Sequence, residues 1–406
     1  MKILVLSSLA YSLINFRGDL LKAMIDNGHT VIACAPDRDP VTEGKLAAMG
    51  VEFRHTPMQR TGTNALSDLR LVFNYASLVR RERPDIVLAY TQKPIIYGGI
   101  ASRIAGLVGR QPRFFALMSG LGQVFSMDAG YSSRLRTAVT RLYRAALARA
   151  QATFVFNADD RSDMIELGIV DRRQKVIQVP GSGVSLTRFP ACAPVIEPIR
   201  FLMIGRLMRN KGIMEFLEAS RIVRREYPAC EFQIVGRCED ENPSGISSEE
   251  SQKLAAEYDV EFVPGTDDVR PYLAACSVFV LPSYYREGLP RTILEALASA
   301  RPVITTDLPG CRDAIESGVN GFLVRPRDAE DLAAAMARFA AKPGLVEEMG
   351  ATALEVARQT YDVQLVNRQL LGEMGLLRST DDLIAGGAHG ASDNVPPNRF
   401  HASTGG

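Results

Sequence analysis

The sequence lacks the features of several large protein classes. None of its apolar runs approaches the roughly 18 residues that a membrane-spanning helix needs. The apolar start, residues 1–13, is followed by Asn15, Phe16 and Arg17 where a signal-peptide cleavage site would lie, so we interpret it as a first strand. A net charge of +1 provides no overall basic field to hold nucleic acid. We therefore expect neither a spanning segment nor a nucleic-acid partner.

Cysteine is scarce, and the glycine fingerprint of dinucleotide binders is missing. The six cysteines are scattered, with no Cys-x-x-Cys pair and no histidine nearby, so the sequence indicates neither a zinc site nor a disulfide framework. A reducing, cytoplasmic compartment fits such cysteines best. After Gly120 and Gly122, Phe125 stands where Gly-x-Gly-x-x-Gly requires its third glycine. This disfavours a nicotinamide-dependent oxidoreductase.

What the sequence does contain is a repeated alternation of strand-like and helix-like stretches. One series of apolar strand-like runs extends from residues 2–8 to 176–179, and a second from 199–204 to 322–324. Prolines at 190, 194 and 198 separate the two series. The pattern predicts an α/β protein with two doubly wound parallel sheets. We expect domains over residues 1–190 and 199–345, helices over 346–377, and a disordered tail over 378–406, which is rich in Gly, Ser, Asn and Pro without periodicity.

Two glutamates follow a predicted buried strand of the second series. The strand-like run ends at Pro282, and Pro290 stands where a helix should have its first residue. Glu287 then lies on the loop between strand and helix, and Glu295 more than one turn into the helix. Both carboxylates can face a crevice at the carboxyl ends of the strands, where open α/β sheets bind ligands. The plain alternative is one loop charge and one solvated helix charge.

A pair of cations follows the first strand of the second series. Arg206 and Lys211 lie between Gly205 and Gly212 at a strand-to-helix turn. The arginine fork can bind two phosphate oxygens, and the lysine adds a point charge, so the turn is suited to a diphosphate. Surface cations that decorate a helix start are the alternative.

A basic helix-like segment covers residues 132–150. It contains no acidic residue and an apolar stripe, together with five arginines: Arg134, Arg136, Arg141, Arg144 and Arg149. A basic amphipathic helix favours an anionic membrane surface, at about 1 kcal/mol for each well-placed cation. A helix packed on the sheet with an arginine-rich outer face remains open as the other interpretation.

Asp37 and Asp39 have the Asp-x-Asp spacing with which some enzymes hold a divalent metal. They follow the second predicted strand of a doubly wound half, where a surface turn is the better interpretation. We expect no metal, because Arg206 and Lys211 can neutralise a diphosphate.

Residues 283–295 resemble the Glu-x7-Glu signature of family 4 of the retaining glycosyltransferases, and residues 205–212 resemble that family's Gly-Arg-x4-Lys-Gly element. The resemblance covers roughly residues 1–375. It implies the GT-B fold, in which two Rossmann-like domains face a cleft and the C-terminal helices cross back onto the first. The first domain would take the acceptor, and the second the nucleotide-sugar donor.

The resemblance also implies roles for individual residues. Arg206 and Lys211 would hold the donor diphosphate, and Glu295 the ribose hydroxyls. Glu287 would bind the donor sugar, together with the amides of Gly288 and Leu289. Gly18 is the candidate for the glycine that lets the backbone approach the donor phosphate. A UDP-sugar would be the co-substrate, with no further cofactor.

One departure from the family pattern concerns the proton that the acceptor hydroxyl loses. Many relatives carry a histidine near the donor sugar, but the four histidines here are residues 29, 55, 389 and 401, and none falls on the loop of residues 118–122. Ser119 occupies that loop instead. The proton acceptor is therefore unassigned, and in a retaining transferase the departing phosphate can itself fill this role.

Three stretches, residues 116–122, 235–244 and 281–295, are similar to those of bacterial transferases that add N-acetylgalactosamine to an undecaprenyl-diphosphate-linked sugar. This similarity implies a UDP-N-acetylhexosamine donor and a lipid-linked saccharide acceptor in polysaccharide or glycan assembly. It also implies a peripheral location on the inner face of the cytoplasmic membrane. A nucleotide-sugar epimerase of the same fold and a non-catalytic nucleotide-sugar-binding protein are the alternatives.

Overall fold

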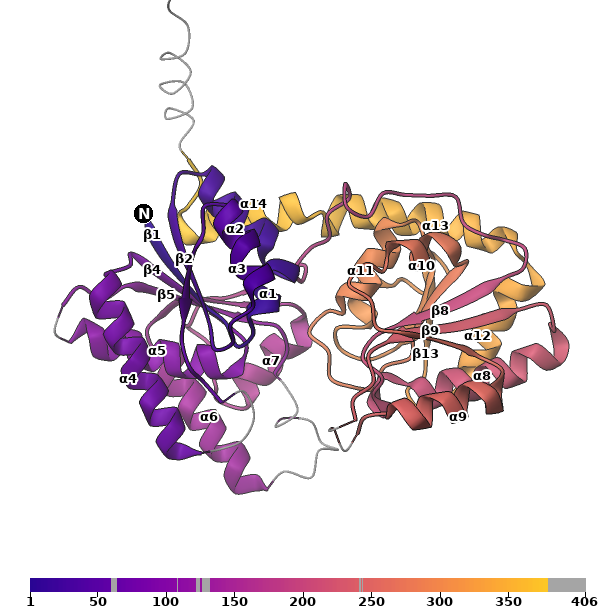
Figure 1. Ribbon diagram of the computed structural model, residues 1–406, viewed down its shortest axis with the longest axis horizontal. Helices are drawn as coiled ribbons and strands as arrows, with labels where there is room; N and C mark the ends of the chain where they lie inside the picture. Colours follow the sequence, from indigo (N-terminus) through magenta and orange to yellow (C-terminus); the bar gives the residue numbers. More distant parts are fainter. Residues whose placement is uncertain are drawn as a thin grey trace, which may run out of the picture.

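The computed structural model describes residues 1–59, 64–107, 109–121, 125, 132–240, 242 and 244–378. Two α/β lobes lie side by side, one built from the first half of the chain and one from the second (Figure 1). The predicted disordered tail lies outside the described residues from residue 379 onwards, as does Gly122. None of the helices in the described part of the chain is both long and apolar enough to cross a membrane.

The first domain is built on a parallel sheet with strand order β3-β2-β1-β4-β5-β6-β7. Its strands are β1 (Lys2–Leu6), β2 (Thr30–Ala35), β3 (Glu52–His55), β4 (Ile86–Tyr90), β5 (Arg113–Met118), β6 (Ala150–Val155) and β7 (Val176–Gln178). Helices cover both faces, so the inner strands are apolar throughout. In β1, Ile3 and Val5 belong to one buried cluster, and Leu4 and Leu6 to another on the opposite face.

The helices of the first domain form two layers. One face carries α1 (Ala10–Asn15), α2 (Gly18–Asp26) and α3 (Pro40–Ala48), and the other α4 (Ala65–Glu82), α5 (Gln92–Gly106) and α6 (Ser133–Leu147). Side-chain caps by Asn64 and Ser132 begin α4 and α6. The segment between β1 and α2 contains α1, a helix of six residues with no side-chain cap.

The second domain repeats this plan with strand order β10-β9-β8-β11-β12-β13, all parallel. Its strands are β8 (Arg200–Ile204), β9 (Glu231–Gly236), β10 (Glu261–Pro264), β11 (Val278–Leu281), β12 (Val303–Thr306) and β13 (Gly321–Val324). Its helices are α8 (Ile213–Glu226), α9 (Ser248–Tyr258), α10 (Arg270–Ala275), α11 (Arg291–Ala298) and α12 (Ala329–Ala341). The predicted fold class, two doubly wound domains, is confirmed.

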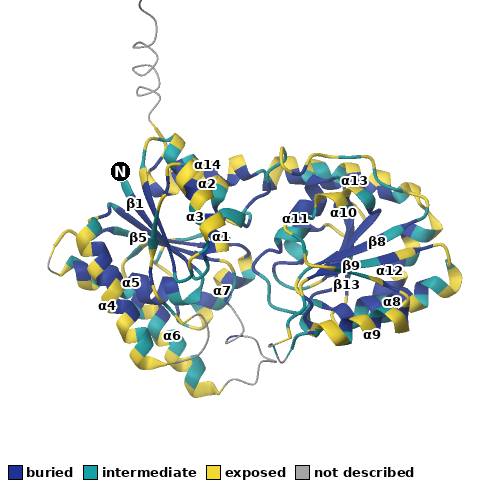
Figure 2. Ribbon diagram, viewed as in Figure 1, coloured by how far each residue is buried: buried dark blue, intermediate teal, exposed yellow. Residues whose placement is uncertain are grey.

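Strand order reverses at one point in each sheet. The neighbours there are β1 and β4 in the first sheet and β8 and β11 in the second. At such a point the connections leave in opposite directions, which opens a crevice at the carboxyl ends of the strands. In Figure 2 the strands are buried, while the exposed residues lie mostly on the outer faces of the helices.

The C-terminal helices connect the two domains. Helix α13 (Gly344–Val356) packs on α11, a π-helical turn spans Ala357–Tyr361, and α14 (Val363–Met374) lies against α2 of the first domain (Figure 1). The segment after α14 is fixed by His29, whose Nε2 lies 2.8 Å from the backbone oxygen of Leu376. Residues 346–377, where we expect helices, contain most of α13 and all of α14.

Apolar packing rather than ion pairing should hold α14 on the first domain. Leu370 is 2% exposed, and Leu370→Ala should lower the free energy of unfolding by about 2–5 kcal/mol because it leaves a cavity. Glu373 makes an exposed ion pair with Lys175 at 2.6 Å, and Glu373→Gln should cost less than about 1 kcal/mol. Urea denaturation measures both, and equal losses would contradict this account.

Candidate active site

The two domains meet backbone to backbone at the carboxyl edges of their sheets. A Cβ atom added to Gly288 would lie 2.3 Å from the backbone oxygen of Ser119, and one added to Gly120 would lie 3.2 Å from the nitrogen of Gly288. Only glycine allows so close an approach. Ser119 and Gly288, both predicted site residues, are thus brought into contact. Leu289 beside them is 8% exposed and packs on Gly181.

The predicted strand–loop–helix around the two glutamates is present, with one correction. Pro290 caps α11 in an extended conformation, and the first helical residue is Arg291. We expected Pro290 to be the first helical residue. Its ψ of 121° is not helical, so Pro290 lies directly before the helix instead. Glu287 lies on the loop after β11, and Glu295 in the second turn of α11.

Lys211 and Glu287 form an ion pair that the sequence did not predict. Lys211 ends a short 3-10 turn after β8, and Glu287 follows β11, the strand beside it in the sheet. The two side chains are only 15% and 12% exposed. Ser283 Oγ donates a 3.0 Å hydrogen bond to the same carboxylate oxygen of Glu287, and the Lys211 ammonium lies 5.5 Å from the centre of the Tyr285 ring. A cation and a carboxylate therefore lie together at the point where the strand order reverses.

The second glutamate has its own cation. Arg291 Nε donates a 3.0 Å hydrogen bond to Glu295 Oε1, from one turn earlier in α11. Burial raises the pKa of Glu295, and the charge of Arg291 opposes that rise. Both carboxylates of the Glu-x7-Glu pattern are thus partly neutralised before any ligand is present.

Arg206 is the accessible cation of the site. Its side chain is 57% exposed, and its only ion pair in the described part of the chain is a long one, 3.6 Å to Glu239. Exposed pairs of this kind contribute little. The guanidinium is therefore available to an anionic ligand at the end of β8.

Helix α7 (Ala158–Glu166) of the first domain contacts the loop that carries Glu287. Asn157 caps this helix and donates a 2.7 Å hydrogen bond to the backbone oxygen of Gly288. Arg286 forms ion pairs with Asp160, at 3.2 Å, and with Asp163. Burial raises the pKa of Asp160, and Arg286 opposes that rise.

A further ion pair lies beside these contacts. Arg312 donates to both carboxylate oxygens of Asp159, at 2.9 and 2.8 Å. Sequence reasoning missed all of these residues. The only local signal was an asparagine before two aspartates, which predicts a helix start but no partner.

The contacts described above do not include the other predicted residues. Gly18 is the first residue of α2, and a Cβ atom added there would meet nothing within 4 Å. The arginines Arg134, Arg136, Arg141 and Arg144 lie on α6, which packs on the opposite face of the first sheet. Asp37 accepts a hydrogen bond from Ala10 N, and Asp39 caps α3. Among the described residues, no three His, Cys, Asp or Glu side chains are grouped so that they could hold a metal ion.

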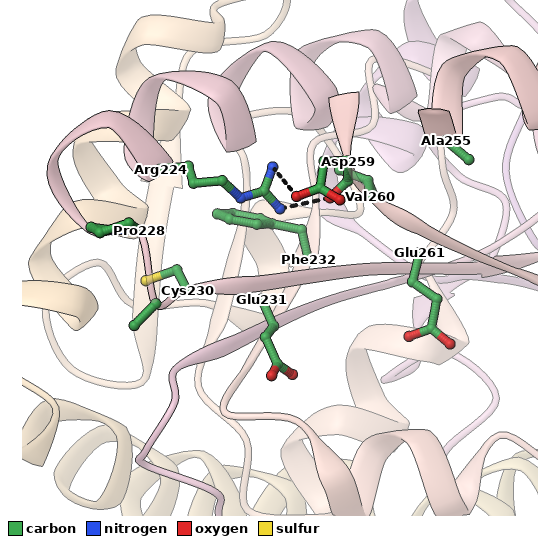
Figure 3. A pocket seen from close by; sticks show the side chains of 10 residues that line it. Arg224, Pro228, Cys230, Glu231, Phe232, Ala255, Asp259, Val260 and Glu261 are labelled. Carbon is green, nitrogen blue, oxygen red and sulfur yellow. Dashed lines mark hydrogen bonds and ion pairs between the residues drawn. The ribbon is translucent and has the colours of Figure 1, made fainter. Parts of the chain in front are cut away.

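One surface pocket is unrelated to these residues. It lies at the amino ends of β9 and β10, where Arg224 extends over Phe232 and bonds to Asp259 (Figure 3). The candidate site lies at the carboxyl ends of β8 and β11 in the same sheet, so the pocket lies at the opposite end of the strands.

The contact between Lys211 and Glu287 should show as energetic coupling. Lys211→Met or Glu287→Gln alone leaves a largely buried partner unmatched, and each should cost about 1–3 kcal/mol of unfolding free energy. The double variant should lose less than the sum of the two, with a coupling of about 0.5–3 kcal/mol. Urea denaturation of the four proteins measures the coupling. Simple additivity would mean that the pair does not form in solution.

Comparison with known proteins identifies both domains. Residues 16–180 match the model of the glycosyl transferase 4-like domain, and residues 198–342 match that of the glycosyl transferases group 1. The chain is 27% identical over 385 residues, 91% of its length and 97% of the relative's, to the N,N'-diacetylbacillosaminyl-diphospho-undecaprenol alpha-1,3-N-acetylgalactosaminyltransferase of Campylobacter jejuni. It is 26% identical, over 67% of this chain and 70% of the relative, to the UDP-Gal:alpha-D-GlcNAc-diphosphoundecaprenol alpha-1,3-galactosyltransferase of Escherichia coli.

Solved structures agree on the fold. The crystal structure of Anabaena HepE in complex with UDP and glucose superposes with a TM-score of 0.73 at 20% identity, over 93% of this chain and 100% of that one. The sucrose-phosphate synthase of Thermosynechococcus elongatus gives a TM-score of 0.72 at 18% identity, over 95% and 100%. The expected GT-B fold is confirmed. The chain belongs to the glycosyltransferases in which a glycosyl transferase 4-like domain is followed by a group 1 domain.

Proposed function

We propose that this glycosyltransferase moves a sugar, with retention of configuration, from a UDP-sugar to a polyprenyl-diphosphate-linked saccharide in polysaccharide or glycan assembly. The observation that carries the proposal is the position of Lys211 and Glu287, in contact at the β8/β11 reversal with Arg206 nearby. The names of the Campylobacter and Escherichia relatives both include an undecaprenol diphosphate, which supports a lipid-linked acceptor here. The first of these names supports an N-acetylhexosamine as the sugar that moves.

The donor would span the carboxyl edge of the second sheet. Arg206 and Lys211 would hold its diphosphate, Glu295 its ribose, and Glu287 its sugar, beside the amides of Gly288 and Leu289. Lys211 and Glu287 are neighbours, and phosphate and sugar are bonded to each other in the donor, so the two side chains can each keep a ligand contact without separating far.

The cations would act on the leaving group. As the bond between the anomeric carbon and the phosphate oxygen breaks, negative charge gathers on the diphosphate, where Arg206 and Lys211 stabilise it. These two charges serve the purpose that a divalent ion serves elsewhere, so we propose a metal-independent reaction with UDP-sugar as co-substrate and no cofactor.

The acceptor hydroxyl would bond to the anomeric carbon on the face that UDP leaves. Of the two histidines in the described residues, His29 is engaged with Leu376 and His55 with Pro36. A departing phosphate oxygen would therefore take the hydroxyl proton.

The protein would act at the inner face of the cytoplasmic membrane, as a peripheral protein. Arg134, Arg141 and Arg144 are exposed on α6, which packs on α5. Helix α4 packs on α5 as well, and its Leu66, Leu69 and Phe73 are 72%, 52% and 61% exposed. Basic side chains on α6 and apolar side chains on α4, two helices that both pack on α5, would each favour an anionic lipid surface.

Purified protein given a panel of UDP-sugars and short polyprenyl-diphosphate glycans tests the reaction, with products identified by mass. A glycan extended by one sugar is the expected product. Conversion of one UDP-sugar into another without transfer would show the epimerase instead. UDP binding with no product from any pair would favour a non-catalytic binding protein.

Arg206→Ala should weaken UDP binding about 10- to 100-fold, because a charged hydrogen bond contributes about 1.5–3 kcal/mol. Arg209→Ala is the matched control: this arginine lies three residues away and pairs with Glu250 of α9, so its loss should leave UDP affinity unchanged. Isothermal titration calorimetry measures both. An equal loss in the two variants would place the diphosphate elsewhere.

Replacing Arg134, Arg141 and Arg144 together with glutamine should weaken binding to anionic vesicles roughly a hundredfold or more, at about 1 kcal/mol for each basic residue. UDP affinity should not change, because α6 lies on the opposite sheet face from α2. A variant with glutamine at Arg161, Arg172 and Arg173, which are also exposed in the first domain, controls for net charge. If both triple variants sediment with vesicles alike, α6 is only structural.

A further inference from the structure

Arg17 is a buried cation at the meeting of the two domains. The residue is 4% exposed and lies between α1 and α2. Its guanidinium carbon lies 5.2 Å from the ring centre of Tyr90 and 5.6 Å from that of Phe156. Tyr90 ends β4 and Phe156 follows β6. The side chain therefore lies at the carboxyl edge of the first sheet, on the side of the second domain.

No carboxylate in the described part of the chain lies within ion-pair distance of Arg17. Its Nε has no hydrogen-bond partner there, and Nη1 makes one long bond of 3.4 Å, to the backbone oxygen of Phe16. Burial lowers the pKa of Arg17 to about 10, so the group keeps its charge at neutral pH. An unmatched buried charge opposes folding.

Arg301 shows how this chain satisfies a buried arginine that has only a structural role. It is fully buried, and each of its three guanidinium nitrogens donates to backbone carbonyl oxygens, among them those of Leu273, Cys192 and Ala274. Every guanidinium nitrogen of Arg301 thus has a hydrogen-bond acceptor, whereas Nε of Arg17 has none among the described residues. The difference leaves Arg17 without a comparable structural partner among the described residues.

The surroundings of Arg17 favour an anion. Arg291 of the second domain approaches it, with its guanidinium 5.7 Å from the ring centre of Phe16, and its charge contributes to lowering the pKa of Arg17. Helix α2 starts directly after Arg17, so the N–H groups of its first turn lack intrahelical partners. A Cβ atom at Gly18 would meet nothing within 4 Å, which leaves room beside that turn.

We propose that Arg17, together with Arg291 and the first turn of α2, binds a phosphate group of a substrate diphosphate, in addition to the contacts that Arg206 and Lys211 make. The inference rests on the proposed function. The phosphate can belong to the UDP-sugar or to the lipid-linked acceptor, and the same arginine fork suits either. Arg291 would turn from Glu295 towards the phosphate, and this would free Glu295 Oε1 for a ribose hydroxyl.

The test compares Arg17→Gln, which removes the charge, with Arg17→Lys, which keeps it. Arg103→Gln is the control, because Arg103 is a partly buried arginine of the same domain that donates to Ala145 on α6. Three quantities are measured: UDP affinity by calorimetry, the KM for a short-chain polyprenyl-diphosphate glycan, and stability in urea.

Arg17→Gln should leave stability equal or raised, since an unmatched buried charge is gone. It should also weaken one substrate at least tenfold. A higher Kd for UDP assigns the phosphate to the donor, and a higher acceptor KM with an unchanged Kd for UDP assigns it to the acceptor. Arg17→Lys should recover most of the loss. If Arg17→Gln lowers stability while Kd and KM both stay within twofold of the wild type, Arg17 is structural and the proposal is overturned.

A second experiment tests the Arg17 site without depending on sugar transfer. Should the wild-type protein form no product, inorganic pyrophosphate is titrated into the Arg206→Ala protein, with and without Arg17→Gln. A tenfold weaker affinity on adding Arg17→Gln supports the site even if the proposed reaction is wrong. An unchanged affinity overturns the site.

Discussion

The ion pair between Lys211 and Glu287 is the interaction on which the arrangement of the site depends. The residues are 76 positions apart, and they meet because β8 and β11 are neighbours at the point where the strand order reverses. Each charge is mostly buried and would be costly alone. Together they keep a cation suited to phosphate and a carboxylate suited to sugar hydroxyls in a fixed relation, which is what a substrate with its sugar bonded directly to phosphate requires.

The first domain supports this pair through contacts of two kinds. Gly288 lies against the Ser119 backbone, and its oxygen accepts a hydrogen bond from Asn157, so the loop next to Glu287 is held by atoms of the other domain. Arg286 and Arg312 add ion pairs to α7. Because the loop belongs to the second domain and its supports to the first, the geometry around Glu287 is complete only when the two domains are together.

The local pattern was enough to predict the individual parts. The apolar run before Pro282 and the proline at 290 identify the strand, loop and helix around Glu287, and two glycines frame Arg206 and Lys211. Two kinds of feature could not be predicted: contacts between residues far apart in the sequence, and helix ends that no glycine, proline or capping residue marks. Arg286 is 126 positions from Asp160, and the turn that divides α13 from α14 contains neither glycine nor proline. Helix α1 has no capping side chain to mark its start.

The charged side chains at the carboxyl edges of the two sheets are the last feature of the interface. Arg17, Arg206, Lys211 and Arg291 all lie near the carboxyl edges, whereas the two carboxylates among them, Glu287 and Glu295, are each engaged by one of these cations. Arg206, Arg286 and Arg312 are likewise paired with acidic residues, which leaves Arg17 as the cation at this interface with no carboxylate partner among the described residues. A single buried cation does not steer polyanions to the surface, but it lowers the energy of a diphosphate that enters. Binding such a ligand would also relieve the repulsion between Arg17 and Arg291, so the same event that fills the site would stabilise contact between the domains.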